Sequence, residues 1–259
     1  MEVAPADDEA WTSGWETGPV SPVDTGAGPM LPGDFQTWDA VAAQYESQGS
    51  DAEAILALEN ALAMRMEVAQ EDPRDEVVRE DIKQIGEKLV AMFNKLGVQC
   101  FRDGDYGQAT QLLLKAAHYT SDRFELALFP SDMARLKLRA ATFNNFGCMD
   151  RRQGKSQSAL KQLRKAQKIE EALGIPSPST IVNICAVLTS LEKYDKAVDE
   201  AKKAIRLLQP RVNALRGLPL EQRPPEADRQ IHLLTVSWHN LAMALLQASP
   251  GDSRASMLS

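Results

Sequence analysis

The amino-acid sequence predicts an all-α protein built as a solenoid of paired helices, and three observations lead to this prediction. From Asp34 onward, apolar residues recur at helical spacing, and no run alternates with a period of two for long enough to indicate a strand. One pattern of large and small residues recurs along this region, as in stacked repeats. Residues 1–33 differ, because five prolines, five glycines and few aliphatic side chains predict a disordered tail. The expected organisation is a tail over 1–33, a helical repeat domain over 34–248 and a second disordered tail over 249–259.

Proline and glycine residues mark where the predicted helices end. Ser177 followed by Pro178 predicts a helix start, because a serine side chain can accept hydrogen bonds from free amides and proline suits the first helical position. The other expected breaks are at Asp72-Pro73, Phe129-Pro130, 174–178, Gln209-Pro210, 217–225 and 249–251.

Four copies of the repeat share one arrangement of residue sizes. In the first helix of each copy a large residue is followed by an apolar and then a small one; after a turn, the second helix carries two alanines around a central apolar residue. The first helices are anchored at Trp38, Phe93, Phe143 and Ile181, and the second helices begin their pattern at Ala54, Ala109, Ala159 and Ala197. Because no single pair can bury its apolar face, the pairs are expected to stack. A half copy from Trp238 is either a capping helix or the start of a longer array.

This arrangement resembles the tetratricopeptide repeat (TPR) family over roughly residues 35–248. The anchoring alanines are 55, 50 and 38 residues apart, against a family period of about 34 residues, so the helices between copies must be lengthened. An apolar stripe that continues from Val78 to Leu96 illustrates this lengthening. Such helices are similar to those of kinesin light chains and spindle-orientation adaptors. The resemblance implies a right-handed superhelix whose first helices line a concave groove that binds a segment of another protein.

The resemblance also implies which residues project into that groove. They are Lys95, Asn145, Asn183 and Asn240 and, further along the same face, Arg102 and Arg152. An asparagine carries both a donor and an acceptor, so the asparagines are expected to hold the main chain of an extended peptide while the cations add charge selectivity. The alternative is that each asparagine bonds a neighbouring helix inside the solenoid.

Charge is distributed unevenly along the chain. Residues 1–64 contain twelve acidic residues and no lysine or arginine, although the net charge of the whole chain is -7. Residues 133–169 hold ten basic residues and one acidic residue. The basic docking face expected there comprises Arg135, Lys137, Arg139, Arg151, Lys155, Lys161, Arg164, Lys165 and Lys168. It is either a solvated helix face or a surface for an acidic protein segment, such as the chain's own tail. Nucleic acid is not expected as a partner, because aromatic residues for base stacking are not interleaved.

The sequence contains none of the patterns that indicate catalysis or metal binding. No nucleophile-base arrangement, glycine-rich phosphate loop or metal-ligand spacing is present. Three distant cysteines without neighbouring histidines argue against a disulfide framework or a zinc site. No enzyme activity, cofactor or small-molecule substrate is therefore expected. The chain shows neither a secretory signal nor a membrane-spanning segment, which predicts no membrane insertion and a cytoplasmic location, with cytoskeletal or ciliary association left open.

Two functions from different classes fit this sequence. The first is a non-enzymatic adaptor or scaffold that binds a peptide segment in the concave groove. The alternative is a structural component of a cytoskeletal or axonemal assembly, docked on microtubules through the basic third repeat.

Overall fold

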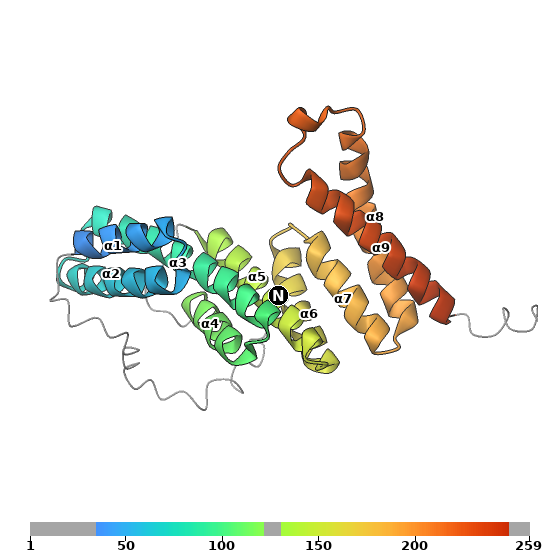
Figure 1. Cartoon of the computed structure of the whole chain (residues 1–259), viewed down its shortest axis with the longest axis horizontal. Helices are drawn as coiled ribbons and strands as arrows, with labels where there is room; N and C mark the ends of the chain where they lie inside the picture. Colours follow the sequence, from blue (N-terminus) through green and yellow to red (C-terminus); the bar gives the residue numbers. More distant parts are fainter. Residues whose placement is uncertain (1–34, 122–130, 249–259) are drawn as a thin grey trace, which may run out of the picture. The chain divides into compact units, whose positions relative to one another are not determined.

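The computed structural model describes residues 35–121 and 131–248, and within these ranges every regular element is a helix (Figure 1). The elements are α1 (Phe35–Ser47), α2 (Asp51–Glu71), α3 (Glu76–Asp103), α4 (Tyr106–Tyr119), α5 (Asp132–Arg152), α6 (Ser156–Ala172), α7 (Pro178–Ser190), α8 (Tyr194–Leu215), the short 3-10 helix η2 (Leu220–Gln222) and α9 (Ala227–Ala248). The all-α fold class predicted from the helical spacing is confirmed. The two predicted tails and the predicted break at Phe129-Pro130 lie outside the described residues.

Consecutive helices pack in pairs, and successive pairs stack. α1 packs against α2, α3 against α4, α5 against α6 and α7 against α8. The first helices also contact one another in order, from α3 to α5, from α5 to α7 and from α7 to α9. The predicted solenoid of TPR-like pairs is confirmed, and α9 is the half copy that follows the fourth pair.

Alanines form the contact surface between the two helices of each pair. The predicted anchors and the alanines that follow them in the pattern all have 0% exposure: Ala54, Ala109, Ala159, Ala197, Ala61, Ala116, Ala166 and Ala204. The central residue between them is buried as well, with 3% exposure at Leu58 and 0% at Leu113 and Leu163. Small residues at these positions let the helix backbones approach closely. The recurrent pattern in the sequence therefore marks the core of every pair.

The turn inside each pair needs a residue with positive φ. Glycine supplies it in the first three pairs, at Gly49 (φ 73°), Gly104 (φ 92°) and Gly154 (φ 73°). In the fourth pair the same place is taken by Glu192 with φ 57°, the one non-glycine residue with positive φ in the described part of the chain. A residue with a side chain is strained in this left-handed region by about 1 kcal/mol.

Replacing Glu192 by glycine is expected to stabilise the protein by about 0.5 kcal/mol, because the relief of strain exceeds the extra entropy of glycine in the unfolded chain. Urea denaturation followed by circular dichroism would measure the change. The matched control is Gly154→Ala, where a new Cβ meets no atom within 4 Å, so that any loss of stability reports the backbone conformation alone. Unchanged stability in Glu192→Gly would contradict the prediction.

The helices that connect successive repeats are lengthened, as predicted for the segment after Pro73. α3 runs for 28 residues, from the connecting segment through the whole first helix of the second pair. Its start is fixed by Asp75, whose carboxylate accepts hydrogen bonds from the backbone N–H groups of Val77 and Val78. Val78 and Ile82 pack in one apolar cluster with residues of α2. The added turns of α3 therefore extend the core shared by the first two pairs.

Two local predictions are corrected by the structure, and the first concerns Pro210. The predicted break at Gln209-Pro210 is wrong, because α8 continues from Tyr194 to Leu215 with the proline inside it. Proline cannot donate to the carbonyl oxygen four residues earlier, which belongs to Arg206. Both residues are exposed, so solvent can satisfy that oxygen, and α9 packs along α8.

The second correction concerns the start of α7. Ser177 is the N-cap residue and Pro178 follows at the first helical position, as predicted, but the serine side chain makes no capping hydrogen bond. Its hydroxyl instead lies 2.9 Å from that of Ser179. The backbone N–H of Ser177 donates to the carboxylate of Glu170 at 3.2 Å, so a residue of the preceding helix holds this turn.

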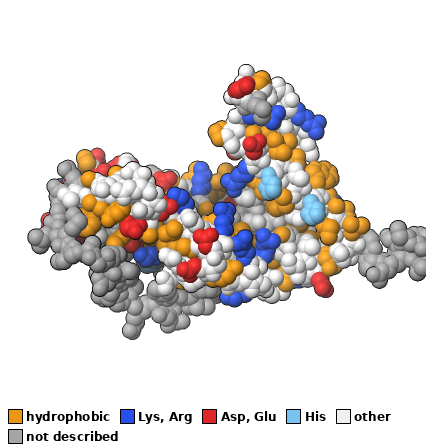
Figure 2. Space-filling model, viewed as in Figure 1, with side chains coloured by type: hydrophobic (Ala, Val, Ile, Leu, Met, Phe, Trp, Pro, Cys, Tyr) orange, Lys and Arg blue, Asp and Glu red, His pale blue; other side chains and the backbone are white. Residues whose placement is uncertain are grey.

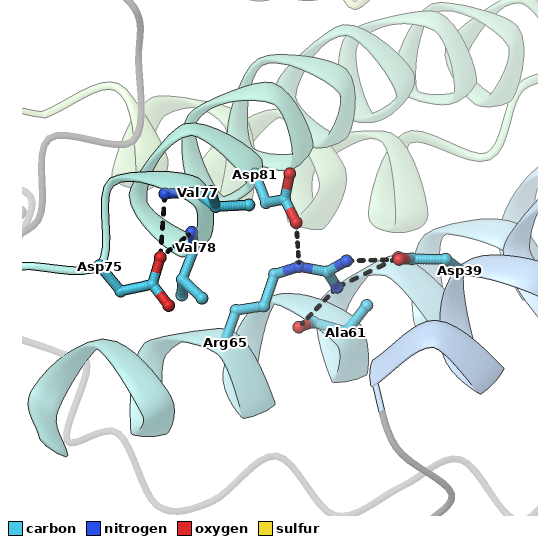
Figure 3. Close-up of polar contacts among 7 residues, drawn as sticks. All are labelled: Asp39, Ala61, Arg65, Asp75, Val77, Val78 and Asp81. Carbon is cyan, nitrogen blue, oxygen red and sulfur yellow. Dashed lines mark hydrogen bonds and ion pairs between the residues drawn. The ribbon is translucent and has the colours of Figure 1, made fainter. Parts of the chain in front are cut away.

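A buried arginine joins the first three helices (Figure 3). Arg65 of α2 is 4% exposed and forms ion pairs with Asp39 of α1 and Asp81 of α3. Its Nε atom lies 3.3 Å from Asp81 Oδ2, and one terminal nitrogen also donates to the carbonyl oxygen of Ala61 at 3.5 Å. A charge-assisted contact therefore crosses the boundary between the first and second pairs.

Candidate functional site

Two concavities open along the first helices of the repeats, and Asn145 lines both of them. The larger has a volume of about 510 Å³ and lies between α3 and α5, where its lining includes Lys95 and Arg102. The smaller has a volume of about 310 Å³ and lies between α5, α7 and α9, where its lining includes Lys137 and Arg229. The structure thus brings together three of the predicted groove residues, Lys95, Arg102 and Asn145.

The asparagines form a hydrogen-bonded ladder between neighbouring first helices. Asn145 Nδ2 donates to Asn94 Oδ1 at 2.8 Å, and Asn183 Nδ2 donates to Asn144 Oδ1 at 3.0 Å. Asn94 donates in turn to Thr142 Oγ1 at 2.9 Å. The donor groups of Asn145 and Asn183 therefore bond neighbouring helices, which is the alternative that the sequence left open. Their acceptor oxygens receive no hydrogen bond from the described residues, so each asparagine keeps one polar group for a ligand.

The ladder stops at α9. Asn240 has the same repeat position as Asn145 and Asn183, but α7 has Val182 at the position where α3 and α5 carry an acceptor asparagine. The Nδ2 atom of Asn240 is buried and has no hydrogen-bond partner among the described residues. A buried donor without a partner lowers stability. Equal repeat position therefore does not give the three asparagines equal surroundings.

The predicted groove cations differ in how much they are held by the chain itself. Lys95 forms an ion pair with Asp51 at 2.8 Å, and its side chain is 65% exposed. Arg152 donates to the carbonyl oxygens of Phe101 and Arg102, each at 3.3 Å, and its guanidinium lies over the ring of Phe101. This contact places a positive charge at the negative end of α3. The side chain of Arg102 is exposed and forms no ion pair with the described residues.

Two charged residues at the smaller concavity were missed by the sequence analysis. Arg229 lies in the first turn of α9, ahead of the repeat anchor Trp238, so no repeat position pointed to it. Glu170 lies near the end of α6, and its buried carboxylate accepts a hydrogen bond from Thr180 Oγ1 at 2.7 Å. Burial raises the pKa of the Glu170 carboxyl. Only the folding of α6, α7 and α9 toward one another brings these groups to the same site.

Four residues of the predicted basic docking face serve contacts within the chain. Arg164 forms an ion pair with the buried Glu200 of α8 at 2.8 Å. Arg135 donates to the carbonyl oxygen of Thr120 at 3.0 Å. The other two residues lie over the aromatic ring of Phe143. Arg139 Cζ is 5.3 Å from the ring centroid, and Lys165 Nζ is 5.1 Å from it.

The other residues of the predicted docking face are exposed on both helices of the third pair. They are Lys137 and Arg151 of α5, Lys155 at the start of α6, and Lys161 and Lys168 of α6. Figure 2 shows lysine and arginine side chains around a hollow near the middle of the visible face. The positive charge of the third pair is therefore divided between the lining of a concavity, at Lys137, and the exposed surfaces of α5, at Arg151, and of α6.

The described residues contain neither a candidate metal centre nor an activated thiol. Among residues 35–121 and 131–248, no group of three or more His, Cys, Asp or Glu side chains is placed to hold a metal ion. Burial raises the pKa of the thiols of Cys100 and Cys148, and that of Cys185 to about 11. Near neutral pH the three thiols are therefore protonated and weakly nucleophilic. In the same described ranges, no helix combines the length and the apolar character needed to cross a membrane.

Comparison with known proteins concerns the fold alone. No protein-family model and no curated protein matches the chain. A crystal structure of a putative kinesin light chain from Podosopora anserina, with nearly identical TPR-like repeats, is 14% identical; the match covers 86% of this chain and 100% of that one, with a TM-score of 0.41. MamA is 16% identical over 81% of this chain and 95% of its own, with a TM-score of 0.38. Pseudomonas aeruginosa pilF is 16% identical over 83% of this chain and 90% of its own, with a TM-score of 0.36. At these identities and scores the neighbours define neither a subclass nor a partner, so the elongated kinesin-light-chain or spindle-adaptor subclass stays a prediction.

Proposed function

We propose that this protein is a non-enzymatic interaction scaffold whose first helices bind an extended acidic segment of another protein. The observation that supports the proposal is the convergence of exposed cations on the two concavities. Arg102 of α3, Lys137 of α5 and Arg229 of α9 line them, and none of the three side chains forms an ion pair with the described residues. Cations on adjoining helices that lack carboxylate partners produce a positive potential, which attracts an acidic ligand.

Asn145 supplies the polar contact at the junction of the concavities. The hydrogen bond from its Nδ2 atom to Asn94 fixes the orientation of the amide group. Its Oδ1 atom then accepts a backbone N–H group of the peptide, whatever side chains the peptide carries. Because the amide is held before the ligand arrives, less conformational entropy is lost on binding. Asn183, held in the same way by Asn144, extends this role to α7.

The groove variant combines Arg102→Glu, Lys137→Glu and Arg229→Glu and so reverses the three unpaired charges that line the two concavities. It is expected to bind an acidic peptide at least tenfold more weakly, because the concavities then repel the peptide instead of attracting it. The probe is a fluorescein-labelled acidic peptide, chosen as the tightest binder of the parent chain from an array of extended acidic sequences. Fluorescence polarisation at two salt concentrations measures its affinity. In a separate variant, Asn145→Ala should weaken binding about fivefold, the effect of one lost hydrogen bond.

The matched control for this experiment is Lys161→Glu combined with Lys168→Glu, which reverses two exposed charges of α6 outside both concavities. This control should retain the affinity of the parent chain within about twofold, because exposed charges at a distance are screened by salt. Equal losses in the groove variant and the α6 variant would mean unspecific attraction and would overturn the groove assignment. An array without any binder would overturn the proposal as a whole.

The α6 variant also tests the second function predicted from the sequence, that of a component of a microtubule-based assembly. Lys161 and Lys168 are both exposed and lie about two helical turns apart, which favours contact with a broad acidic surface. In that case co-sedimentation with microtubules would be lost in the α6 variant and retained in the groove variant. The opposite pattern would favour the peptide scaffold.

A further inference from the structure

The half copy α9 carries an apolar surface that no described residue covers. Trp238 is 50% exposed, Leu245 47% and Leu246 71%, whereas Leu241 on the inner side of the helix is buried against the fourth pair. After Arg229, α9 contains no acidic residue, lysine or arginine. Hydrophobic side chains gather over this helix in Figure 2. A contiguous exposed apolar surface of this kind marks an interaction site.

The exposed residues of α9 occupy the positions that the complete pairs bury beneath their second helix. In order, Trp238, Ala242, Leu245 and Leu246 correspond to Phe93, Gly97, Cys100 and Phe101 of α3. In α3 the exposures are 0% for Phe93, 8% for Cys100 and 6% for Phe101. Gly97 faces Leu113 of α4, and its equivalent Ala242 is exposed. α9 therefore presents the surface of a first helix without a second helix on it.

The neighbouring helix α8 adds a charge requirement to this surface. Ion pairs connect the second helices of the first and second pairs, from Glu59 of α2 to Lys115 of α4, and those of the third and fourth pairs, from Arg164 of α6 to Glu200 of α8, each at 2.8 Å. Lys202 of α8 has the repeat position of Glu59 and Arg164, and it is exposed without an ion pair to the described residues. A helix that packs on α9 beside α8 would lie next to Lys202, and a carboxylate on that helix would pair with the lysine.

We propose that this surface binds an amphipathic helix of a partner protein, which packs on α9 as the second helix of a fifth pair. Its apolar face carries two small residues around a leucine, because that arrangement in α4 covers the equivalent surface of α3. Beside this face it carries a carboxylate that pairs with Lys202. With this helix bound, α9 would form a fifth pair after the four pairs of the chain. The surface is separate from the two concavities proposed to bind the acidic peptide.

The test uses a labelled peptide with the α4 sequence, Tyr106–Tyr119, capped at both ends and carrying Lys115→Glu. Fluorescence polarisation with the full chain should show saturable binding. The unmodified α4 peptide should bind about threefold more weakly, because its lysine faces Lys202 with the same charge, and Lys202→Glu in the protein should reverse this preference. Ala242→Leu should weaken binding at least tenfold, because it fills the space that receives the peptide leucine.

Ala242 is exposed in the chain alone, so Ala242→Leu should keep the parent melting temperature and the parent affinity for the acidic groove peptide. Absence of saturable binding, or equal binding by the parent chain and Ala242→Leu, would overturn the proposal. It would also be overturned if light scattering showed a dimer of the parent chain that Ala242→Leu converts to a monomer, since the occupant would then be a second copy.

Discussion

Replacing Asp39 and Asp81 together by asparagine is expected to destabilise the fold by about 3 kcal/mol, because the buried Arg65 then loses two ion pairs. The guanidinium side chain is 5% exposed, whereas the two aspartate side chains are 40% and 39% exposed. Because the arginine is buried and the aspartates are partly exposed, removing the aspartates should cost more stability than removing the arginine. Arg65→Met removes the buried charge, keeps much of the side-chain volume and leaves two carboxylates that water can reach, so it should cost about 1 kcal/mol.

Urea denaturation of the three proteins, followed by circular dichroism, would compare these free energies of unfolding. The control is Glu80→Gln, which removes an exposed ion pair between Glu80 and Lys83 on α3 and should change stability by less than about 0.5 kcal/mol. A larger loss in Arg65→Met than in the double aspartate variant would show that the arginine stabilises mainly by packing, and would contradict the electrostatic account.

Gly147→Ala is expected to destabilise the fold by about 2 kcal/mol, against the ordinary preference of helices for alanine. A Cβ atom at Gly147 would lie 2.4 Å from Leu163 Cγ and 2.7 Å from its Cδ2. Rotation about the Cβ–Cγ bond leaves Cγ in place, and the fully buried Leu163 has no free space for another χ1 rotamer, so the third pair must open. At the equivalent Gly97 a Cβ would lie 3.2 Å from the nearest atoms of Leu113, and Gly97→Ala should change stability by less than about 0.5 kcal/mol because strain and helix preference offset each other.

The same denaturation experiment measures both glycine variants, and Gly97→Ala is the matched control for Gly147→Ala. A second-site change identifies the cause: Leu163→Ala removes the clashing atoms, so adding Gly147→Ala to it should cost nothing further. A loss of about 2 kcal/mol from Gly147→Ala in that background as well would place the cause in the backbone of α5 and would contradict the packing explanation.

The sequence predicts the helices and their pairing well, because the residues that decide them recur locally. The alanines that carry the repeat pattern in the second helices, from Ala54 and Ala61 to Ala197 and Ala204, follow a fixed spacing, and in the structure they are fully buried. Turn glycines recur in the same way, except at Glu192. Pro210 was predicted wrongly because local propensity favours a break there, whereas the packing of α9 along α8 stabilises a continuous helix.

The candidate site could be predicted only in part. Lys95, Arg102 and Asn145 have repeat positions that place them on first helices, and they line one concavity. Arg229 has no such position and reaches the smaller concavity because α9 begins well before its repeat anchor. Arg152 shares the repeat position of Arg102, but it bonds the end of α3 because those carbonyl oxygens lie within reach only after the helices stack.

By itself, the sequence determined that this protein is an all-α solenoid of TPR-like pairs, since the 3.6-residue period and the spacing of small residues act within single helices and between consecutive ones. Tertiary structure alone decided which polar groups face each other across different pairs. The asparagine ladder, the Arg65 contacts and the cations of the two concavities join residues that are distant in sequence. Their partners are set by the rotation and offset between stacked pairs, which no local pattern encodes. The exposed surface of α9 depends on both levels. The sequence determines that α9 has the residue pattern of a first helix, and the tertiary structure decides that no described residue covers that pattern.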